Sequence, residues 1–453
     1  MKALIRLGVM AAGLFLAHTA TAQDMLEAYL RKGLDSNLAL RRQDFDLQKA
    51  RLDLQRAKTL FYPQADFSSQ YTLANGGRQQ DIPIGDLLNN VYSTLNELTS
   101  SNKFPQVQNQ AIQFLPNNFH DTKLEVSVPI INQNIRYNQQ LKEELINNRQ
   151  ANTDVYRREL VKTIKQAYYR FLQADRSVAI YTNALTLVQE NLRVSEKMVN
   201  NNVATKEIVL RAKAQVSQVQ SSLIEATNNR KNAAAYFNFL LNEPLETVVA
   251  VDSTVAVQYK APEPVSFETP VGREELAQIK SSQKLLTTNL KLNRSYIVPT
   301  LNAFYNVGFQ GFGLKFNGDQ FYQLGGLQLR WSLFRANDNK YKIQQSLLDI
   351  DALSNQYKEV EQQLSLQVRT AYNDYYSSLQ SQQALQDEVQ SAQETYRLTD
   401  RRFREGQALQ LELTDARTQL TNAQIRYSLA QLAVLNKAAE VERATASYQF
   451  KNN

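Results

Sequence analysis

The sequence predicts a mainly α-helical protein with a small β part, built from duplicated helix–strand–strand–helical hairpin units. Three observations support this prediction. Residues that break helices are absent from two long segments, these two segments match each other at a constant offset, and four short segments alternate between apolar and polar residues.

Proline and glycine, which break helices, leave two long segments almost untouched. Proline is absent from 130–243 and after Pro299, and after Gly326 glycine occurs only at Gly406. Both segments are rich in Ala, Leu, Gln, Glu, Lys and Arg. We therefore expect helical hairpins over about 137–241 and about 341–446.

The two segments also match without gaps at an offset of 204 residues. The matching pairs include Tyr137 with Tyr341, Arg193 with Arg397, and Ala212 with Ala416. A match over about 100 residues indicates an internal duplication.

At this offset Gly406 lies opposite Asn202, and glycine and asparagine best tolerate the left-handed conformation that ends a helix. Each segment should therefore reverse there, with a long helix of about 60 residues before the turn and a shorter one of about 40 after it. The predicted tip residues are Asn200, Asn201, Asn202, Arg404 and Gly406.

Four segments alternate with the period of a β-strand that has one apolar face: about 65–74, 121–131, 300–310 and 322–334. Each alone could be a hairpin on a soluble core. Arg330, Lys123 and Glu125 on the polar faces fit a watery lumen, whereas Trp331 and Tyr305 fit an apolar exterior. Four strands cannot close a membrane barrel, whose known examples start at eight, so several chains must contribute or the strands do not span a membrane.

The first residues have the pattern of a secretory signal peptide, which we assign to 1–22. Lys2 and Arg6 precede an apolar stretch, and Ala20-Thr21-Ala22 forms a small-residue cleavage site. Elsewhere polar residues interrupt every apolar run within a few positions. If the protein crosses a membrane, strands must do so.

Composition argues against several functional classes. The chain has no cysteine, and His120 is the only histidine outside the signal segment. No metal site, thiol nucleophile or Ser-His-Asp set is therefore expected, and we predict neither catalysis nor a cofactor. Without Lys2 and Arg6 the chain has 49 basic and 44 acidic residues, a scattered charge of +5, so nucleic acid is not an expected partner. We expect His120 to be solvated or interfacial.

The order of the segments resembles the TolC-like outer membrane factors over nearly the whole mature chain. The resemblance rests on 60–65 (LFYPQA) and its echo 296–301 (YIVPTL), each before a strand, and on the tip segments 402–406 (RFREG) and 411–416 (LELTDA). It implies a homotrimer with a 12-stranded β-barrel in outer-membrane lipid and a 12-helix tunnel in the periplasm.

Members of this family pass drugs, metals or polypeptides from an inner-membrane pump of the RND, ABC or MFS type, with a periplasmic adaptor (membrane fusion) protein joining the two. The resemblance therefore implies the exit duct of a tripartite efflux or type I secretion system. The cargo stays open, because selection occurs at the pump. The alternative is a periplasmic coiled-coil scaffold or adaptor, which explains the helices but not four symmetrically placed strands.

The resulting layout has a first repeat over 23–242, a linker over 243–272, a second repeat over 273–446 and a tail over 447–453. We expect the linker and the tail to form an irregular belt around the tube. The first repeat contains an insert over about 75–119, which the topology places at the cell exterior, either as a solvent-facing lid or as a surface receptor.

The resemblance also implies that acids at Glu412 and Asp415 constrict the periplasmic entrance, with Glu207 as a possible third ring. Glu412 and Asp415 are three residues apart and share one helix face. Three-fold symmetry would make them stacked rings of carboxylates that favour cations and bind blocking metal ions. The alternative is that these acids only line solvated helix faces, and Arg404 or Arg402 could supply counter-cations.

Overall fold

The computed structural model describes residues 21–251 and 272–450, and the chain divides into two compact units. Unit 1 contains the described residues up to 51, then 144–286, and those from 348 onward; unit 2 contains 52–143 and 287–347. The predicted signal peptide, apart from its last two residues, most of the linker over 243–272 and the end of the tail lie outside the described residues.

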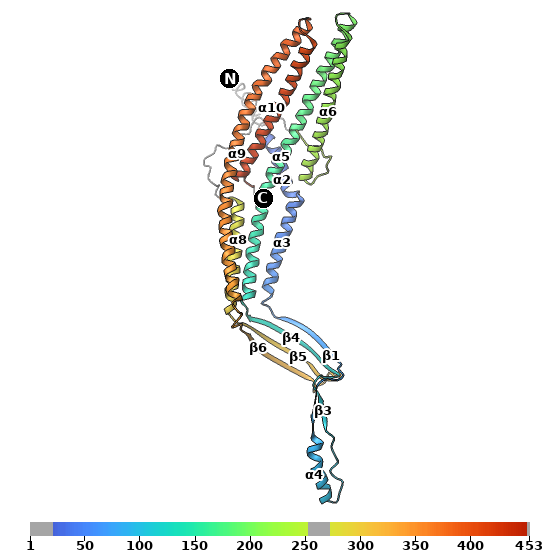
Figure 1. Ribbon diagram of the computed structural model, residues 1–453, viewed down its shortest axis with the longest axis vertical. Helices are drawn as coiled ribbons and strands as arrows, with labels where there is room; N and C mark the ends of the chain where they lie inside the picture. Colours follow the sequence, from blue (N-terminus) through green and yellow to red (C-terminus); the bar gives the residue numbers. More distant parts are fainter. Residues whose placement is uncertain (1–20, 252–271, 451–453) are drawn as a thin grey trace, which may run out of the picture. The chain divides into compact units, whose positions relative to one another are not determined.

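Helices dominate the chain (Figure 1). Two short helices, α2 (Thr21–Ser36) and α3 (Leu38–Thr59), precede the first strand, and α8 (Glu274–Arg294) with the 3-10 turn η1 (Ser295–Ile297) precedes the first strand of the second repeat. The long helices are α5 (Gln133–Asn200) and α9 (Asp338–Arg404), with return helices α6 (Lys206–Leu240) and α10 (Gln410–Thr445). None of the described helices has an apolar stretch long enough to cross a membrane.

In unit 1, α5 lies beside α6 and α9 beside α10 (Figure 1). The ion pairs Arg230–Asp175, at 2.6 Å, and Lys437–Asp374, at 2.9 Å, join the partners of each hairpin. The largest core cluster gathers side chains from α2, α3, α5, α6 and α10 around Tyr168, which is fully buried. Tyr168 of the long helix α5 therefore serves packing between helices.

Unit 2 holds a four-stranded antiparallel sheet in the order β1-β4-β5-β6 (Figure 1). The strands are β1 (Gln64–Thr72), β4 (Phe119–Ile131), β5 (Thr300–Phe312) and β6 (Phe321–Arg330). The two strands of each repeat pair with each other, and β4 pairs with β5 to join the repeats.

Two strands end earlier than the alternating pattern suggests. The pattern extended through residue 334, but β6 ends at Arg330, because Arg330 pairs with Thr300, where β5 begins. For the same reason β1 ends at Thr72, which pairs with Phe119, the first residue of β4. Strand ends thus depend on the partner strand, which a single segment does not reveal.

The insert between β1 and β4 is a folded element. It contains a two-stranded sheet of β2 (Gln79–Ile82) and β3 (Gln110–Gln113), with the helix α4 (Ile84–Leu98) between them. No helix was predicted in this insert.

Of the two environments expected for His120, solvated or interfacial, the solvated one is wrong. Its side chain is fully buried, and its Nε2 lies 2.8 Å from the Gln320 side-chain oxygen and 3.0 Å from the Lys315 carbonyl oxygen. The loop after β5 covers the imidazole, and the Phe316 ring packs against it at 5.1 Å.

Candidate functional site

The two helical hairpins reverse through the same backbone geometry. Asn202 and Gly406 have φ of 59° and 74°, the left-handed conformation that suits asparagine and glycine. In each turn an N–H donates across six residues, from Val203 to Met198 (2.9 Å) and from Gln407 to Arg402 (2.8 Å). These bonds occupy equivalent positions of the two repeats.

The predicted tip residues therefore mark the two turns. Asn200 and Arg404 are the last residues of α5 and α9, and Asn201, Asn202 and Gly406 lie within the turns.

The Glu412 side chain contacts residues on both sides of the second turn. Its carboxylate accepts a hydrogen bond from the Leu409 backbone N–H (3.4 Å) and lies 3.7 Å from the Arg402 guanidinium. Arg402 also donates to the Gln407 carbonyl oxygen at 3.2 Å. Glu412, the third residue of α10, thus satisfies the N–H of the N-cap residue Leu409 and also pairs with the helix that precedes the turn.

Asp415 and Glu207 point into solvent within the described chain and contact only their own helices. Asp415 accepts a hydrogen bond from Gln419 at 2.9 Å, and Glu207 pairs with Arg211 at 2.5 Å. The contacts of the described residues do not join Glu207 to the acids of α10. Any ring of carboxylates must therefore come from several copies of the chain.

Within one chain Glu412 pairs with Arg402 and not with Arg404. Arg404 pairs instead with Asp400 on its own helix, at 2.9 Å. Arg402 lies in the last turn of α9, with its guanidinium 3.7 Å from the Glu412 carboxylate.

A buried arginine near the tip, Arg417, was not predicted from the sequence. Arg417 lies on the apolar face of α10 between Leu413 and Leu420, where its guanidinium donates to the Tyr396 hydroxyl at 3.3 Å and lies over that ring. An arginine at helical spacing between two buried leucines was the available signal. Its Nε and Nη1 find no partner among the described residues.

A polar contact also joins the two hairpins. The Ser195 hydroxyl of α5 donates to the Gln410 side-chain oxygen of α10 at 3.2 Å, and both residues are buried. The beginning of α10 is therefore attached to both hairpins.

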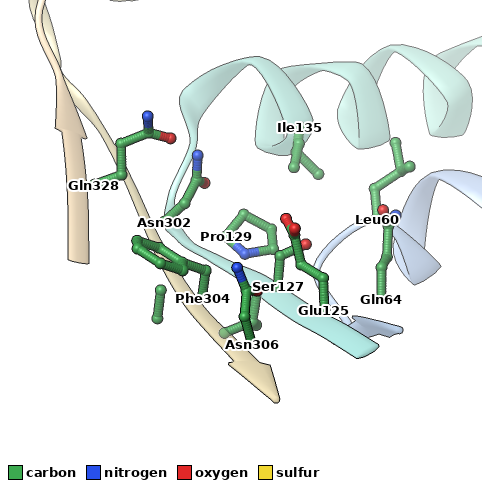
Figure 2. Close-up of a pocket in the computed structure, with 12 residues that line it drawn as sticks. Leu60, Gln64, Glu125, Ser127, Pro129, Ile135, Asn302, Phe304, Asn306 and Gln328 are labelled. Atoms are coloured by element: carbon green, nitrogen blue, oxygen red, sulfur yellow. The ribbon is translucent and has the colours of Figure 1, made fainter. Parts of the chain in front are cut away.

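The polar face of the four-stranded sheet is continuous. In the pairing register Glu125 lies opposite Asn306, and Asn302 opposite Gln328, so polar side chains of three strands share one face. This face borders a cavity of about 510 Å³, whose lining includes Phe304 and the polar residues Glu125, Ser127, Asn302, Asn306 and Gln328 (Figure 2).

The other face of the sheet is apolar. Leu124 pairs with Val307 and Val126 with Tyr305, and Leu327 and Leu329 of β6 are more than 60% exposed. One face thus suits water and the other suits hydrocarbon.

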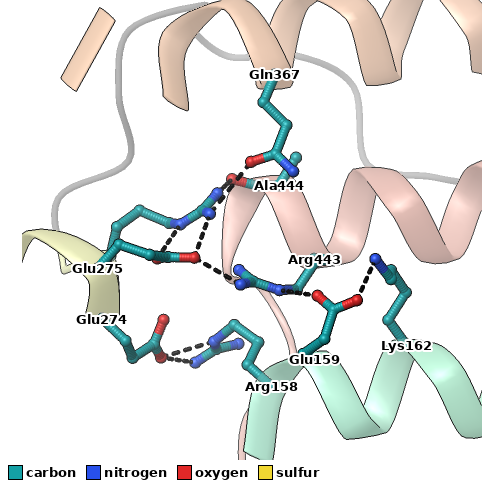
Figure 3. A network of polar contacts seen from close by, with 9 residues as sticks. Arg158, Glu159, Lys162, Glu274, Glu275, Gln367, Arg443 and Ala444 are labelled. Carbon is teal, nitrogen blue, oxygen red and sulfur yellow. Dashed lines mark hydrogen bonds and ion pairs between the residues drawn. The ribbon is translucent and has the colours of Figure 1, made fainter. Parts of the chain in front are cut away.

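Unit 1 contains a buried ionic network (Figure 3). Glu275 at the start of α8 accepts hydrogen bonds from Arg443 (2.5 Å) and from Arg273 (2.8 and 3.0 Å), whose side chain is 1% exposed. Arg443 reaches on to Glu159 of α5 at 3.1 Å. Burial by itself would raise the pKa of Glu275, but the two arginines outweigh it and lower the pKa to about 2.

Comparison with known proteins agrees with this architecture. Residues 270–447 match the outer membrane efflux protein family. The chain resembles that family over its second repeat. It has the TolC-like fold: it aligns with the CusC channel structure at a TM-score of 0.74 and 15% identity, covering 93% of this chain and 92% of that one. The Neisseria gonorrhoeae MtrE outer membrane channel aligns at a TM-score of 0.72 and 17% identity, covering 93% and 88%.

The relatives that the chain resembles in sequence are named for different export processes. The probable efflux pump outer membrane protein TtgC of Pseudomonas putida is 24% identical over 286 residues, covering 58% of this chain and 56% of the relative. The alkaline protease secretion protein AprF of Pseudomonas aeruginosa is 22% identical over 301 residues, covering 62% and 60%. This chain therefore spans less than two thirds of the length of these relatives.

Proposed function

We propose that this protein is the outer-membrane exit duct of a tripartite efflux or type I secretion system, a homotrimer that spans the outer membrane and extends into the periplasm. It conducts substrates passively and catalyses no reaction. An inner-membrane pump supplies the energy, and a periplasmic adaptor protein joins pump and duct.

One observation carries this proposal: the sheet of each chain has a polar face, an apolar face and two edges without a partner strand in the described chain. β1 and β6 each pair on one side only. In hydrocarbon every unpaired backbone group costs several kcal/mol, so an open edge must be closed. If β6 of one copy pairs with β1 of the next, three copies close a barrel of twelve strands, with the polar cavity face inside.

The relatives leave two cargo classes open, since one is named for an efflux pump and the other for protease secretion. The duct architecture serves both because the pump selects the cargo. Deletion of the gene, followed by a toxic-compound susceptibility panel and a comparison of secreted proteins, distinguishes them. Hypersensitivity indicates efflux, and loss of a secreted polypeptide indicates type I secretion.

Membrane fractionation tests the proposal against the periplasmic scaffold. The processed protein should appear in the outer-membrane fraction, require detergent for extraction, and have the native mass of a trimer. Inserted into a planar bilayer, it should conduct ions. A monomer that stays in the soluble periplasmic extract would exclude the duct and support the scaffold.

We further propose that Glu412 and Asp415 form carboxylate rings at the periplasmic entrance, with Glu207 as a third ring. Two features support the proposal: Glu412 and Asp415 lie within the first two turns after the Gly406 reversal, and Asp415 is exposed. Carboxylates held close together around an axis repel one another and attract cations. In this proposal the Arg402–Glu412 pair competes with the ring.

A further inference from the structure

The insert between β1 and β4 carries a helix that is held on one side only. Asn89 of α4 accepts a hydrogen bond from the Val107 N–H (2.7 Å) and donates to the Val107 carbonyl oxygen (2.8 Å). Asn96 does the same with Phe104, at 3.0 and 2.7 Å. The returning segment is thus bound to α4 by two asparagine side chains one heptad apart.

Further contacts use the same face of α4. The Tyr92 ring packs against Phe104 at a centroid distance of 5.8 Å. A Cβ at Gly85 would lie 2.4 Å from the Val107 carbonyl oxygen, so only glycine lets the returning segment approach there. Positions 85, 89, 92 and 96 follow helical spacing, and the returning segment occupies this face.

A second face of α4 is apolar and has the spacing of a coiled-coil seam. Ile84, Leu88, Val91, Leu95 and Leu98 are separated alternately by four and three residues. Val91 is 52% exposed and Leu98 77% exposed in the described chain. The helix therefore presents a two-heptad seam that the chain itself leaves partly uncovered.

The residue types along the seam favour three helices over two. With Leu88 and Leu95 at the a positions, the d positions are Ile84, Val91 and Leu98. Leucine at a with isoleucine at d shifts parallel coiled coils from dimers to trimers and tetramers, and Ile84 and Val91 place β-branched side chains at two of the three d positions here. Asp86 and Glu97, the acidic residues of α4, lie outside the a and d positions.

We propose that the α4 helices of three copies of this chain pack seam to seam, as a three-helix bundle at the extracellular end of the barrel. The occupant of each apolar seam is thus a second and a third copy of the same helix. The inference rests on the proposed trimeric duct, which fixes the number of copies and the axis.

The position of the insert supports this choice of partner. The chain enters the insert from β1, an edge strand of the sheet, and leaves it into β4. The closing contact of the proposed barrel joins that same edge to the next copy, so the helix seam continues an interface that the barrel already requires. Tethering at three symmetric points gives the helices a high effective concentration, which lets a helix of 15 residues associate although it would be marginal alone.

The absence of native cysteine makes a direct test possible. Val91→Cys places one thiol on the seam, and Asn90→Cys, the matched control, places one on the neighbouring position that faces away from it. Both full-length variants are treated in outer membranes with a short bifunctional maleimide, and the products are separated after complete denaturation. Leu88→Cys provides a second seam position in case Val91→Cys does not assemble.

The proposal predicts that covalent dimers dominate for the Val91→Cys and Leu88→Cys variants and are rare for Asn90→Cys. Native mass in detergent is measured on the same samples. Trimers without seam-specific cross-links would overturn the helix bundle and leave the proposed duct intact. In that case a membrane-impermeant maleimide shows what covers the seam: the thiol reacts if the seam is a free surface, and lipid protects it if the seam lies on the membrane. A monomeric mass would instead overturn the duct, and the bundle with it.

Discussion

Replacing Glu275 by glutamine removes the anion that two buried arginines share. Arg273 and Arg443 both donate to this carboxylate, and their side chains are 1% and 7% exposed. After the substitution Arg443 keeps Glu159, whereas Arg273 keeps only neutral acceptors, the Ala444 carbonyl oxygen and the Gln367 side chain. A buried cation is thereby left without a counter-ion, which is strongly destabilising.

The pKa gives the size of the loss. A carboxyl group whose pKa falls from 4.5 to about 2 contributes about 3 kcal/mol to the folded state when it is ionised. Because the folded-state pKa is the lower one, this stabilisation is complete above the unfolded pKa and disappears as the pH falls from about 4.5 toward 2. The Glu275→Gln variant should therefore be about 3 kcal/mol less stable than the wild type at pH 7, with a difference that shrinks in this acid window.

Unfolding of the detergent-solubilised protein, followed by helical circular dichroism at one fixed protein concentration, measures this difference across pH. The matched control is Glu394→Gln, which removes a carboxylate from a 2.5 Å pair with Arg397 that is exposed to solvent and should hardly affect stability. Equal stability of Glu275→Gln and the wild type at pH 7 would refute the reasoning. So would a loss that stays constant down to pH 3.

Three further perturbations test the other parts of the structure. The double variant Glu412→Ala, Asp415→Ala should lower cation selectivity and weaken block by divalent cations in single-channel recordings. The control double variant Asp349→Ala, Asp351→Ala removes two exposed acids of α9 far from the turn and should change neither property. Identical recordings for the two double variants would contradict the proposed carboxylate rings. Gly406→Val should cost about 1–2 kcal/mol of unfolding free energy because of the positive φ, and Asn202→Gly should be nearly neutral; a fully stable Gly406→Val variant would contradict the turn geometry. Leu327→Arg on the apolar sheet face should lower the free energy of unfolding by about 2–4 kcal/mol and reduce the amount of trimer in outer membranes. The adjacent substitution Gln328→Arg on the polar face should still allow the trimer to assemble. If Gln328→Arg were the more damaging of the two, the assignment of the lipid-facing and water-facing sides of the sheet would be wrong.

Local chemistry accounts for the features that could be predicted from residues alone. Asn202 and Gly406 mark turns because few other residues tolerate the left-handed backbone, and this preference acts at a single position. The alternation in β4 and β5 predicts strands because side chains of a strand point to opposite faces, whatever the partner is. These signals need no knowledge of distant contacts.

Other features were missed or wrong because they depend on residues far apart in the chain. His120 is buried by a loop about two hundred residues later, so its neighbours in sequence could not reveal its environment. Arg443 and Glu275 are 168 residues apart. The helix α4 was not predicted because it is short and flanked by prolines and glycines, although the spacing of its apolar residues is present in the sequence.

The amino-acid sequence determined the duplicated order of helices and strands, the two reversal points and the two-faced character of the sheet, because each follows from backbone preference or from periodicity over a few residues. Only the tertiary structure decided where each strand ends, which arginine holds Glu412, and how buried charges join α5, α8 and α10. These depend on which surfaces meet, since a partner strand ends a strand and burial determines the strength of an ion pair. The apolar seam of α4 belongs to both: the sequence sets its spacing, and the fold leaves it exposed.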